Sequence, residues 1–268
     1  MPIKARNDYD PETMRSFLPL LVVLVGCKPP PDAPEELNEL VGYLYTNVPG
    51  EDPEPLELGA VNLESWLEDR IDETLEGYTV DNLTPEAITA LGDGEQDLDE
   101  LAGAAVGHMS VFSPAALVDA IVVDDPMLIY PSTYTAFERE FEGDPACFAS
   151  GECDWLEAEV HASFDYVLMQ VDTHSRVQYR WVDTEMGRVY AERTWLRDPA
   201  EVTSTFIEVE QQYYLRMILP DGSGSRSIQA TWVVARLVGD MPENAALNLL
   251  IDNMAKQAVK LDTYMEER

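Results

Sequence analysis

Two kinds of hydrophobic periodicity divide the chain near residue 100. Between residues 35 and 100, apolar side chains recur every three or four positions, which is typical of amphipathic helices. From residue 156 onward apolar and polar residues alternate with a period of two, which is typical of strands with one buried face. The helical positions are Leu37, Leu40, Val41, Leu44, Leu63, Trp66, Leu67 and Ile71.

The alternating part predicts an antiparallel meander. Its segments lie near residues 156–166, 176–181, 189–197, 207–219 and 228–238, and short turns join them. The turn at 221–225 (Asp-Gly-Ser-Gly-Ser) has the composition of a hairpin loop. Upstream, residues 106–112 predict one more strand, and residues 113–121 predict a short helix that begins at Ser113-Pro114.

A long amphipathic helix is predicted at the C-terminal end. Residues 240–243 (Asp-Met-Pro-Glu) resemble a capping box with proline in the first turn. An apolar stripe then runs from Leu247 to Met265, over more than five turns. Because such a stripe must be buried, we expect this helix to lie on the sheet.

The first 34 residues have the pattern of an export signal followed by a spacer. Residues 17–25 are uninterruptedly apolar, a run too short for a bilayer, which takes about 20 residues. The run ends in Leu24-Val25-Gly26-Cys27, which resembles the lipobox of bacterial lipoproteins; Met14 is an alternative start. That resemblance implies a signal peptide over residues 1–26, acylation of Cys27 and anchorage in the outer membrane, on its periplasmic or cell-surface side. A buried first helix is the competing interpretation, but the prolines of residues 27–34 favour a tether.

Composition excludes several classes of protein. The chain has 51 Asp and Glu against 17 Lys and Arg, a formal net charge of -34. Residues 28–100 alone hold 21 acidic side chains and only Lys28 and Arg70 as bases. No basic stripe exists for a phosphate backbone, so nucleic acid is excluded as a partner. The hydrophobic fraction of 46% excludes a disordered polyelectrolyte.

Cysteine usage agrees with export. Cys147 and Cys153 flank a short polar loop that an oxidising compartment would close as a disulfide. A reduced pair is the alternative, while a metal site lacks further ligands, since only His161 is near. No metal or other cofactor is predicted.

The order of elements after residue 103 resembles the helix-grip fold of the START-like, or SRPBCC, superfamily. The most telling stretch is residues 227–237 (SIQATWVVARL), followed by Met241-Pro242 and the long helix. The fold class implied is α+β: an antiparallel sheet of five to six strands gripped by the C-terminal helix, preceded by an acidic helical segment. We expect that segment at residues 35–102 and the START-like domain at residues 103–268. Residues 122–157 have no clear counterpart in the superfamily pattern.

In that superfamily the space between sheet and helix often holds an apolar ligand. By strand parity and helix periodicity, seven side chains are expected to point into it. Arg193 shares the parity of one strand and is the candidate charged group for a ligand head; a salt bridge on an exposed face is the competing interpretation. Ordinary core packing is the alternative for the seven, which are Phe164, Tyr166, Trp181, Tyr213, Trp232, Leu250 and Met254.

No catalytic motif is present, so we expect no enzymatic activity. His161, Ser163 and Asp165 would project in a row from one strand face and would not converge as a triad. The leading hypothesis is a membrane-anchored, non-enzymatic lipoprotein that binds a hydrophobic or amphipathic small molecule. The alternatives are a fully packed interaction module whose acidic helices dock a basic protein partner, an enzyme of unrecognised type, and the half-barrel of lipoprotein-sorting factors.

Overall fold

The computed structural model describes residues 32–89, 91, 98, 100–166, 169–203, 207–237 and 245–268. These residues belong to one compact unit that spans Pro31–Arg268. The lipobox with Cys27 and the expected cap at residues 240–243 lie outside the described residues. So does the side chain of Tyr166.

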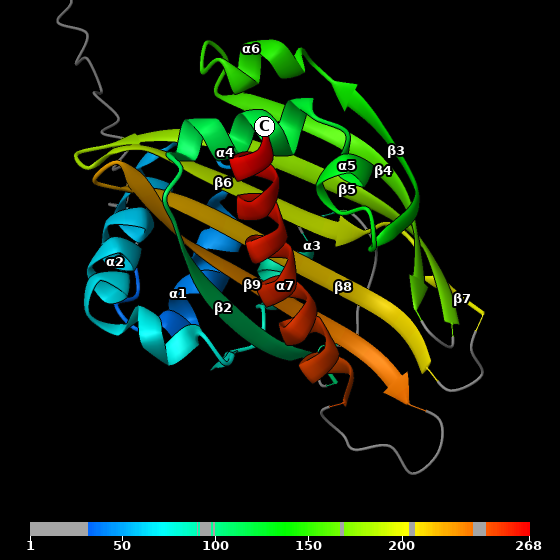
Figure 1. Cartoon of the computed structure of the whole chain (residues 1–268). Helices are drawn as coiled ribbons and strands as arrows, with labels where there is room; N and C mark the ends of the chain where they lie inside the picture. The colour runs from blue at the N-terminus through cyan, green and yellow to red at the C-terminus, as the bar shows by residue number, and fades with distance from the viewer. Residues whose placement is uncertain are drawn as a thin grey trace, which may run out of the picture. The chain divides into compact units, whose positions relative to one another are not determined.

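A curved antiparallel sheet is the centre of the fold (Figure 1). Within the described residues it has nine strands. The strand order is β1-β2-β9-β8-β6-β5-β4-β3, and β7 pairs with β5 beside this path. Apolar side chains alternate along the long strands, so each strand presents one residue set to each face. The strands are β1 (Tyr78–Val80), β2 (Ala102–Ser110), β3 (Tyr134–Glu142), β4 (Trp155–Tyr166), β5 (Met169–Thr184), β6 (Gly187–Leu196), β7 (Glu201–Val202), β8 (Ile207–Asp221) and β9 (Gly224–Leu237).

Helix α7 (Ala245–Glu267) lies across the concave face of the sheet (Figure 1). It contacts β2 and β9, and also the short helices α4 (Pro114–Val123) and α5 (Pro126–Ile129). Ser113 caps α4 by accepting a hydrogen bond from the Ala116 backbone, as the sequence predicts. Another short helix, α6 (Pro145–Ala149), covers the same face further along.

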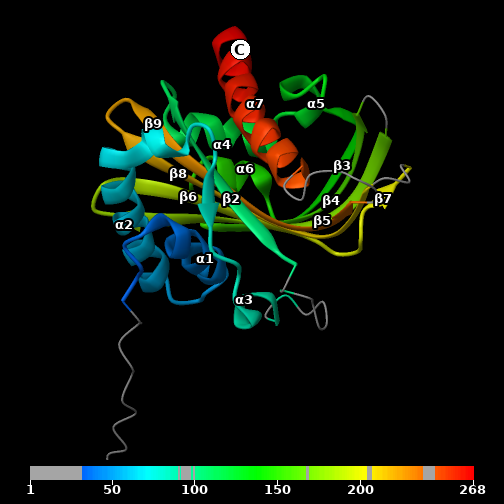
Figure 2. The same cartoon turned by 90° about the horizontal axis from the view of Figure 1, so that it is seen from below.

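The opposite, convex face carries the N-terminal helices (Figure 2). These are α1 (Leu37–Asn47), α2 (Glu54–Arg70), the 3-10 helix η1 (Ile71–Thr74) and α3 (Pro85–Thr89). Their apolar faces are buried against the outward side chains of β6, β8 and β9 in one continuous core. Arg180 fastens α1 from the sheet, since its guanidinium donates hydrogen bonds to the carbonyls of Val48 (2.9 Å) and Gly50.

The expected fold class is confirmed: the protein is α+β, with an antiparallel sheet gripped by a long C-terminal helix. The described part of the chain, however, contributes nine strands to the sheet in place of five or six. The stretch at 122–157 without an expected counterpart supplies β3, which pairs with β4. The boundary expected at residue 102/103 falls within the compact unit, because β1 pairs with β2 and the N-terminal helices share the sheet's core.

Candidate functional site

A cavity of about 280 Å³ lies between the concave face of the sheet and helix α7. Strands β3–β6, β8 and β9 form its floor and walls, while α4, α5 and α7 cover it. The volume lies just below the range of about 300–1,000 Å³ typical of small-molecule sites. A cavity of this size suits a compact or single-chain ligand.

One end of the cavity is polar and charged. Tyr179, Glu192, Arg216 and Gln229 are cross-strand neighbours in β5, β6, β8 and β9, so they form one row on the concave face. The first three line the cavity. A second row on the same face lies two residues away from the first in each strand. It consists of Val177, Thr194, Tyr214 and Thr231.

Glu192 and Arg216 are an ion pair at this end. The Arg216 Nη1 lies 3.3 Å from Glu192 Oε2, and the two side chains are 12% and 11% exposed. Tyr190 donates a second hydrogen bond to Glu192 Oε2 at 2.9 Å. Burying two charges is tolerated only when they are paired and hydrogen-bonded, and this geometry meets that condition.

Four tyrosines surround the pair: Tyr130, Tyr179 and Tyr190 are buried, and Tyr214 is partly buried. Burial raises the pKa of each phenol, in the case of Tyr179 to about 12. The phenols therefore stay protonated at neutral pH and can donate hydrogen bonds. Burial by itself lowers the pKa of Arg216, but the fields of Tyr214 and Glu192 outweigh it and hold the pKa well above the usual value.

The closed end of the cavity is an aromatic plug. Beyond the charged row the next neighbours are Trp181, Tyr190 and Ile218, and Phe148 of α6 packs on them. Phe148 stacks on Trp181 with ring centroids 5.9 Å apart, and Trp181 Nε1 donates to the Phe148 carbonyl at 2.9 Å.

Toward the other end the lining carries no charged side chain among the described residues and is mainly apolar, although Thr173, Ser175 and Gln212 also belong to it. Leu249 is 39% exposed, so the lining reaches the surface there. The cavity is therefore amphipathic along the strand direction, with charge at the closed end and hydrocarbon toward the surface. The apolar lining residues are Phe164, Val171, Leu196, Val209, Val233, Ala235, Leu249 and Leu250.

A third charged side chain, Arg139 of β3, also lines the cavity. Its Nη1 and Nη2 donate to the carbonyls of Ile121 (2.8 Å) and Val122 (2.6 Å) in the last turn of α4. Its guanidinium also stacks over Phe141, 4.6 Å from the ring centroid. Arg139 thus connects the edge of the sheet to the helix that roofs the cavity.

The predicted cavity residues separate into three groups. Phe164, Leu250 and Met254 line the cavity. Trp181 lies on the same face, but in the plug beneath α6 and outside the cavity. The predicted placement of Arg193, Tyr213 and Trp232 is wrong, since all three lie on the convex face beneath the N-terminal helices.

Arg193 is buried there between aromatic rings. Its Nε donates to Gln178 Oε1 at 2.6 Å, and its guanidinium lies 5.5 Å from the Tyr45 ring centroid and 5.2 Å from that of Trp195. Burial lowers its pKa. It is therefore neither a head-group ligand nor an exposed ion pair, the two interpretations that the sequence left open.

A β-bulge explains part of the parity error. Between Val209 and Gln211 the register of β8 shifts by one residue, so Val209 faces the cavity while Tyr213 faces α1. The second cause is the N-terminal layer, which requires large apolar side chains on the convex face. The concave face was consequently left with the polar residues that sequence reasoning assigned to solvent.

The functional candidates that sequence reasoning missed are polar residues of the opposite parity. A signal for them is present, because polar residues recur at every second position in three neighbouring strands. They are Glu192 and Thr194 in β6, Gln212, Tyr214 and Arg216 in β8, and Thr231 in β9, together with Arg139, Tyr130 and Tyr179.

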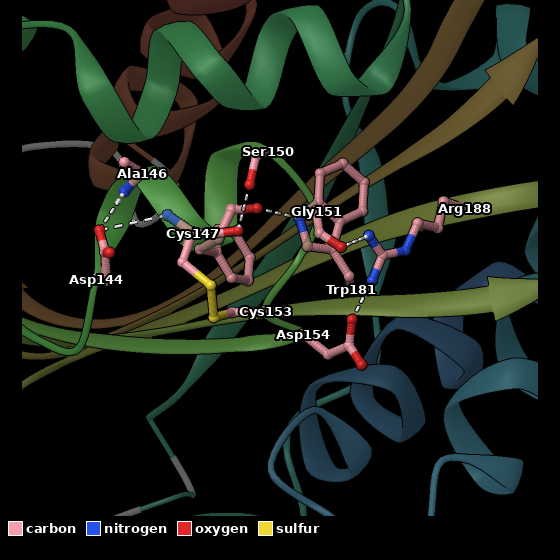
Figure 3. The surroundings of a disulfide bond; sticks show 10 residues. Asp144, Ala146, Cys147, Ser150, Gly151, Cys153, Asp154, Trp181 and Arg188 are labelled. Carbon is pink, nitrogen blue, oxygen red and sulfur yellow. Dashed lines mark hydrogen bonds and ion pairs between the residues drawn. A yellow bond between two sulfur atoms is a disulfide. The ribbon is translucent and has the colours of Figure 1, made fainter.

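Cys147 and Cys153 are joined as a disulfide, with Cα atoms 5.3 Å apart (Figure 3). Asp144 caps the adjoining α6 by accepting from the backbone amides of Ala146 and Cys147. Arg188 bonds to Asp154 and to the Gly151 carbonyl on the other side of the loop. The disulfide loop thereby holds α6 and Phe148 over the plug.

Within the described residues, no group of three or more His, Cys, Asp or Glu side chains has a geometry suited to a metal ion. His161 and His174 are cross-strand neighbours on the convex face, and their rings stack 4.2 Å apart. No helix in the described part of the chain is long and apolar enough to cross a bilayer.

Sheet, helix and cavity together define a helix-grip protein with an internal, amphipathic cavity. Three solved structures have a similar arrangement. The human StarD13 lipid transfer and protein localization domain is 12% identical (76% of this chain and 95% of that chain covered, TM-score 0.40). The STAR-related lipid transfer protein from Xanthomonas axonopodis is 9% identical (64% and 97% covered, TM-score 0.39), and Ara h 8.0201 is 13% identical (63% and 99% covered, TM-score 0.36).

No protein-family model matches the sequence. No curated protein matches it either.

Proposed function

We propose that the protein binds an amphipathic small molecule, without catalysis, in the cavity between the sheet and α7. The observation that carries the proposal is the gradient of the lining, from the Glu192–Arg216 pair at the closed end to Leu249 and Leu250 at the surface. A polar head would reach the charged row while an apolar chain would lie along the hydrocarbon part.

A fully packed core is the competing hypothesis. Two features favour a cavity that receives a ligand. Most lining side chains of β6 and β8 are hydrogen-bonding groups where a closed core would carry hydrocarbon; they are Glu192, Thr194, Gln212, Tyr214 and Arg216. The convex face of the same strands, which is closed by α1 and α2, does carry Tyr213, Leu215 and Trp232.

Binding is tested by native mass spectrometry of the purified protein and by titration with Nile red, a neutral dye whose emission reports apolar surroundings. The informative variant is Ala162→Phe, because Ala162 is buried and lines the cavity. The matched control is Ala136→Phe on the neighbouring strand, where the side chain is exposed. We expect the first variant to lose binding and the second to keep it. Equal binding by both, or none by the wild type, overturns the proposal.

We further propose that the chain is an exported lipoprotein held in the outer membrane by an acylated Cys27. The support is the lipobox pattern at residues 24–27 and the proline-rich residues that follow. Acyl chains contribute about 0.8 kcal/mol per buried CH2, so a Cys27 that carries several of them would anchor the protein effectively permanently. Cys27→Ser should move the protein from the membrane fraction to the soluble fraction of the cells that make it. An unchanged membrane fraction would contradict the anchor.

Docking of a basic partner through residues 35–102 stays a prediction, as does the absence of enzymatic activity. The apolar faces of α1 and α2 are buried on the sheet. A partner would consequently meet their acidic outer faces, and its binding should weaken as salt is added.

A further inference from the structure

The cavity carries more positive than negative charge. Among the described residues, its charged lining side chains are Arg139, Arg216 and Glu192. This balance is the reverse of the chain as a whole, in which 51 acidic residues outnumber 17 bases. The composition of the chain therefore does not account for the excess of positive side chains in the cavity.

Arg216 is neutralised by Glu192, as described above, whereas Arg139 is not neutralised by any described carboxylate. Its hydrogen-bond acceptors are the Ile121 and Val122 carbonyls, which present the partial negative charge of a helix C-terminus. The Arg139 guanidinium is half-buried and bonded only to neutral dipoles. An anion placed beside it would therefore be bound favourably.

The sheet and an aromatic contact place the three charges around Tyr179. Glu192 is its cross-strand neighbour in β6, and Arg216 is the neighbour of Glu192 in β8. Arg139 stacks over Phe141, whose ring centroid lies 6.4 Å from that of Tyr179. Burial raises the pKa of Tyr179, Arg139 and Arg216 oppose that rise, and Glu192 adds to it. All three therefore act on the ring at the polar end of the cavity. A ligand head placed beside Tyr179 would meet two guanidinium groups and one carboxylate that is already paired.

We infer that the ligand is a single-chain amphiphile with an anionic head group, and that Arg139 is the residue that selects the charge. The inference rests on the proposed function and narrows it to a class of ligand. A carboxylate fits the planar fork of a guanidinium, and a single chain suits a cavity of about 280 Å³, which lies just below the usual range for small-molecule sites.

The test compares three probes of one chain length: decanoate, decanol and methyl decanoate. Each is titrated against the Nile red complex, decanoate below its critical micelle concentration and the two neutral probes below their solubility in water. We expect decanoate to bind at least about tenfold more tightly than the two neutral probes, the worth of one charge-assisted hydrogen bond. Arg139→Gln should remove this preference, and Arg139→Lys, which keeps the charge, should retain part of it. Arg226→Gln, in the β8–β9 hairpin and paired with Asp221, is the matched control and should leave the preference unchanged.

The outcomes separate the inference from the function on which it rests. Equal affinity for all three probes would overturn the anionic ligand and leave the binding function standing. Failure of every probe and of Nile red to bind would overturn the binding function itself. If Arg139→Gln does not fold, the preference of the wild type among the probes decides the inference without it.

Discussion

Tyr45 of α1 packs edge-on against Trp232 of β9, with ring centroids 5.7 Å apart and an angle of 66° between the ring planes. The Trp232 indole also donates a hydrogen bond to the Asp81 carbonyl at 2.8 Å. Both side chains are fully buried. The acidic N-terminal helices and the gripped sheet therefore share one core, so we expect them to fold as one unit.

Replacing the indole should expose this coupling. Trp232→Ala is expected to lower the free energy of unfolding by about 3–5 kcal/mol, because it leaves a large cavity beneath α1. Urea denaturation followed by circular dichroism measures the loss. Trp155→Ala, at a side chain that is 38% exposed, is the control and should cost far less. Two separate unfolding transitions in the wild type would contradict a single core.

The sequence predicted the positions of strands and helices better than it predicted which face of the sheet each side chain occupies. Alternation located the strands from residue 156 onward, and the stripe from Leu247 to Met265 located α7, because both patterns are local. The convex layer is not local: whether Trp232 faces α1 or α7 depends on what covers each face of the sheet. The covering helices are built from residues far away in the chain, and the β8 bulge changes parity within one strand.

Strand β3 was missed although its alternation is visible. Phe137, Arg139 and Phe141 alternate with Glu138, Glu140 and Glu142. The acidic residues suggested a solvated loop. They are instead the exposed side chains of a strand whose other face is apolar. Strand alternation also identifies Arg139. It shares the parity of the apolar residues Phe137 and Phe141, and so it faces the cavity.

Helix α7 is fastened to β2 by one carboxylate. Asp262 accepts from Ser110 Oγ at 2.6 Å, and its other oxygen lies 2.9 Å from His108 Nε2. We expect Asp262→Ala to cost about 1–3 kcal/mol of stability and to speed release of a bound amphiphile, because the roof of the cavity is loosened. Stopped-flow displacement measures the release rate. Asp252→Ala, on the exposed side of α7, is the control, and an equal acceleration there would contradict a specific fastening.

The disulfide should contribute to stability through α6. In the chain-entropy model a loop this short is worth about 2 kcal/mol. Replacing both Cys147 and Cys153 with serine should lower the free energy of unfolding by that amount and change the fluorescence of Trp181, whose indole bonds to α6. Each single replacement, Cys147→Ser or Cys153→Ser, removes the same bond and should give a similar loss, which controls for local effects of either side chain. Unchanged fluorescence of Trp181 would show that α6 stays in place without the bond.

The buried tyrosines predict an alkaline limit of stability. Because the pKa of Tyr179 is raised from 10.0 to about 12, the folded state holds the phenolic proton more tightly than the unfolded state. This contribution is fully present below pH 10 and disappears as the pH rises toward 12. It amounts to about 2–3 kcal/mol for a shift of this size. Tyr179→Phe should flatten the fall in stability above pH 10, measured by urea denaturation at each pH, whereas Tyr78→Phe, outside the cavity, should leave it unchanged. A fall equally steep in Tyr179→Phe would assign the alkaline limit to other groups.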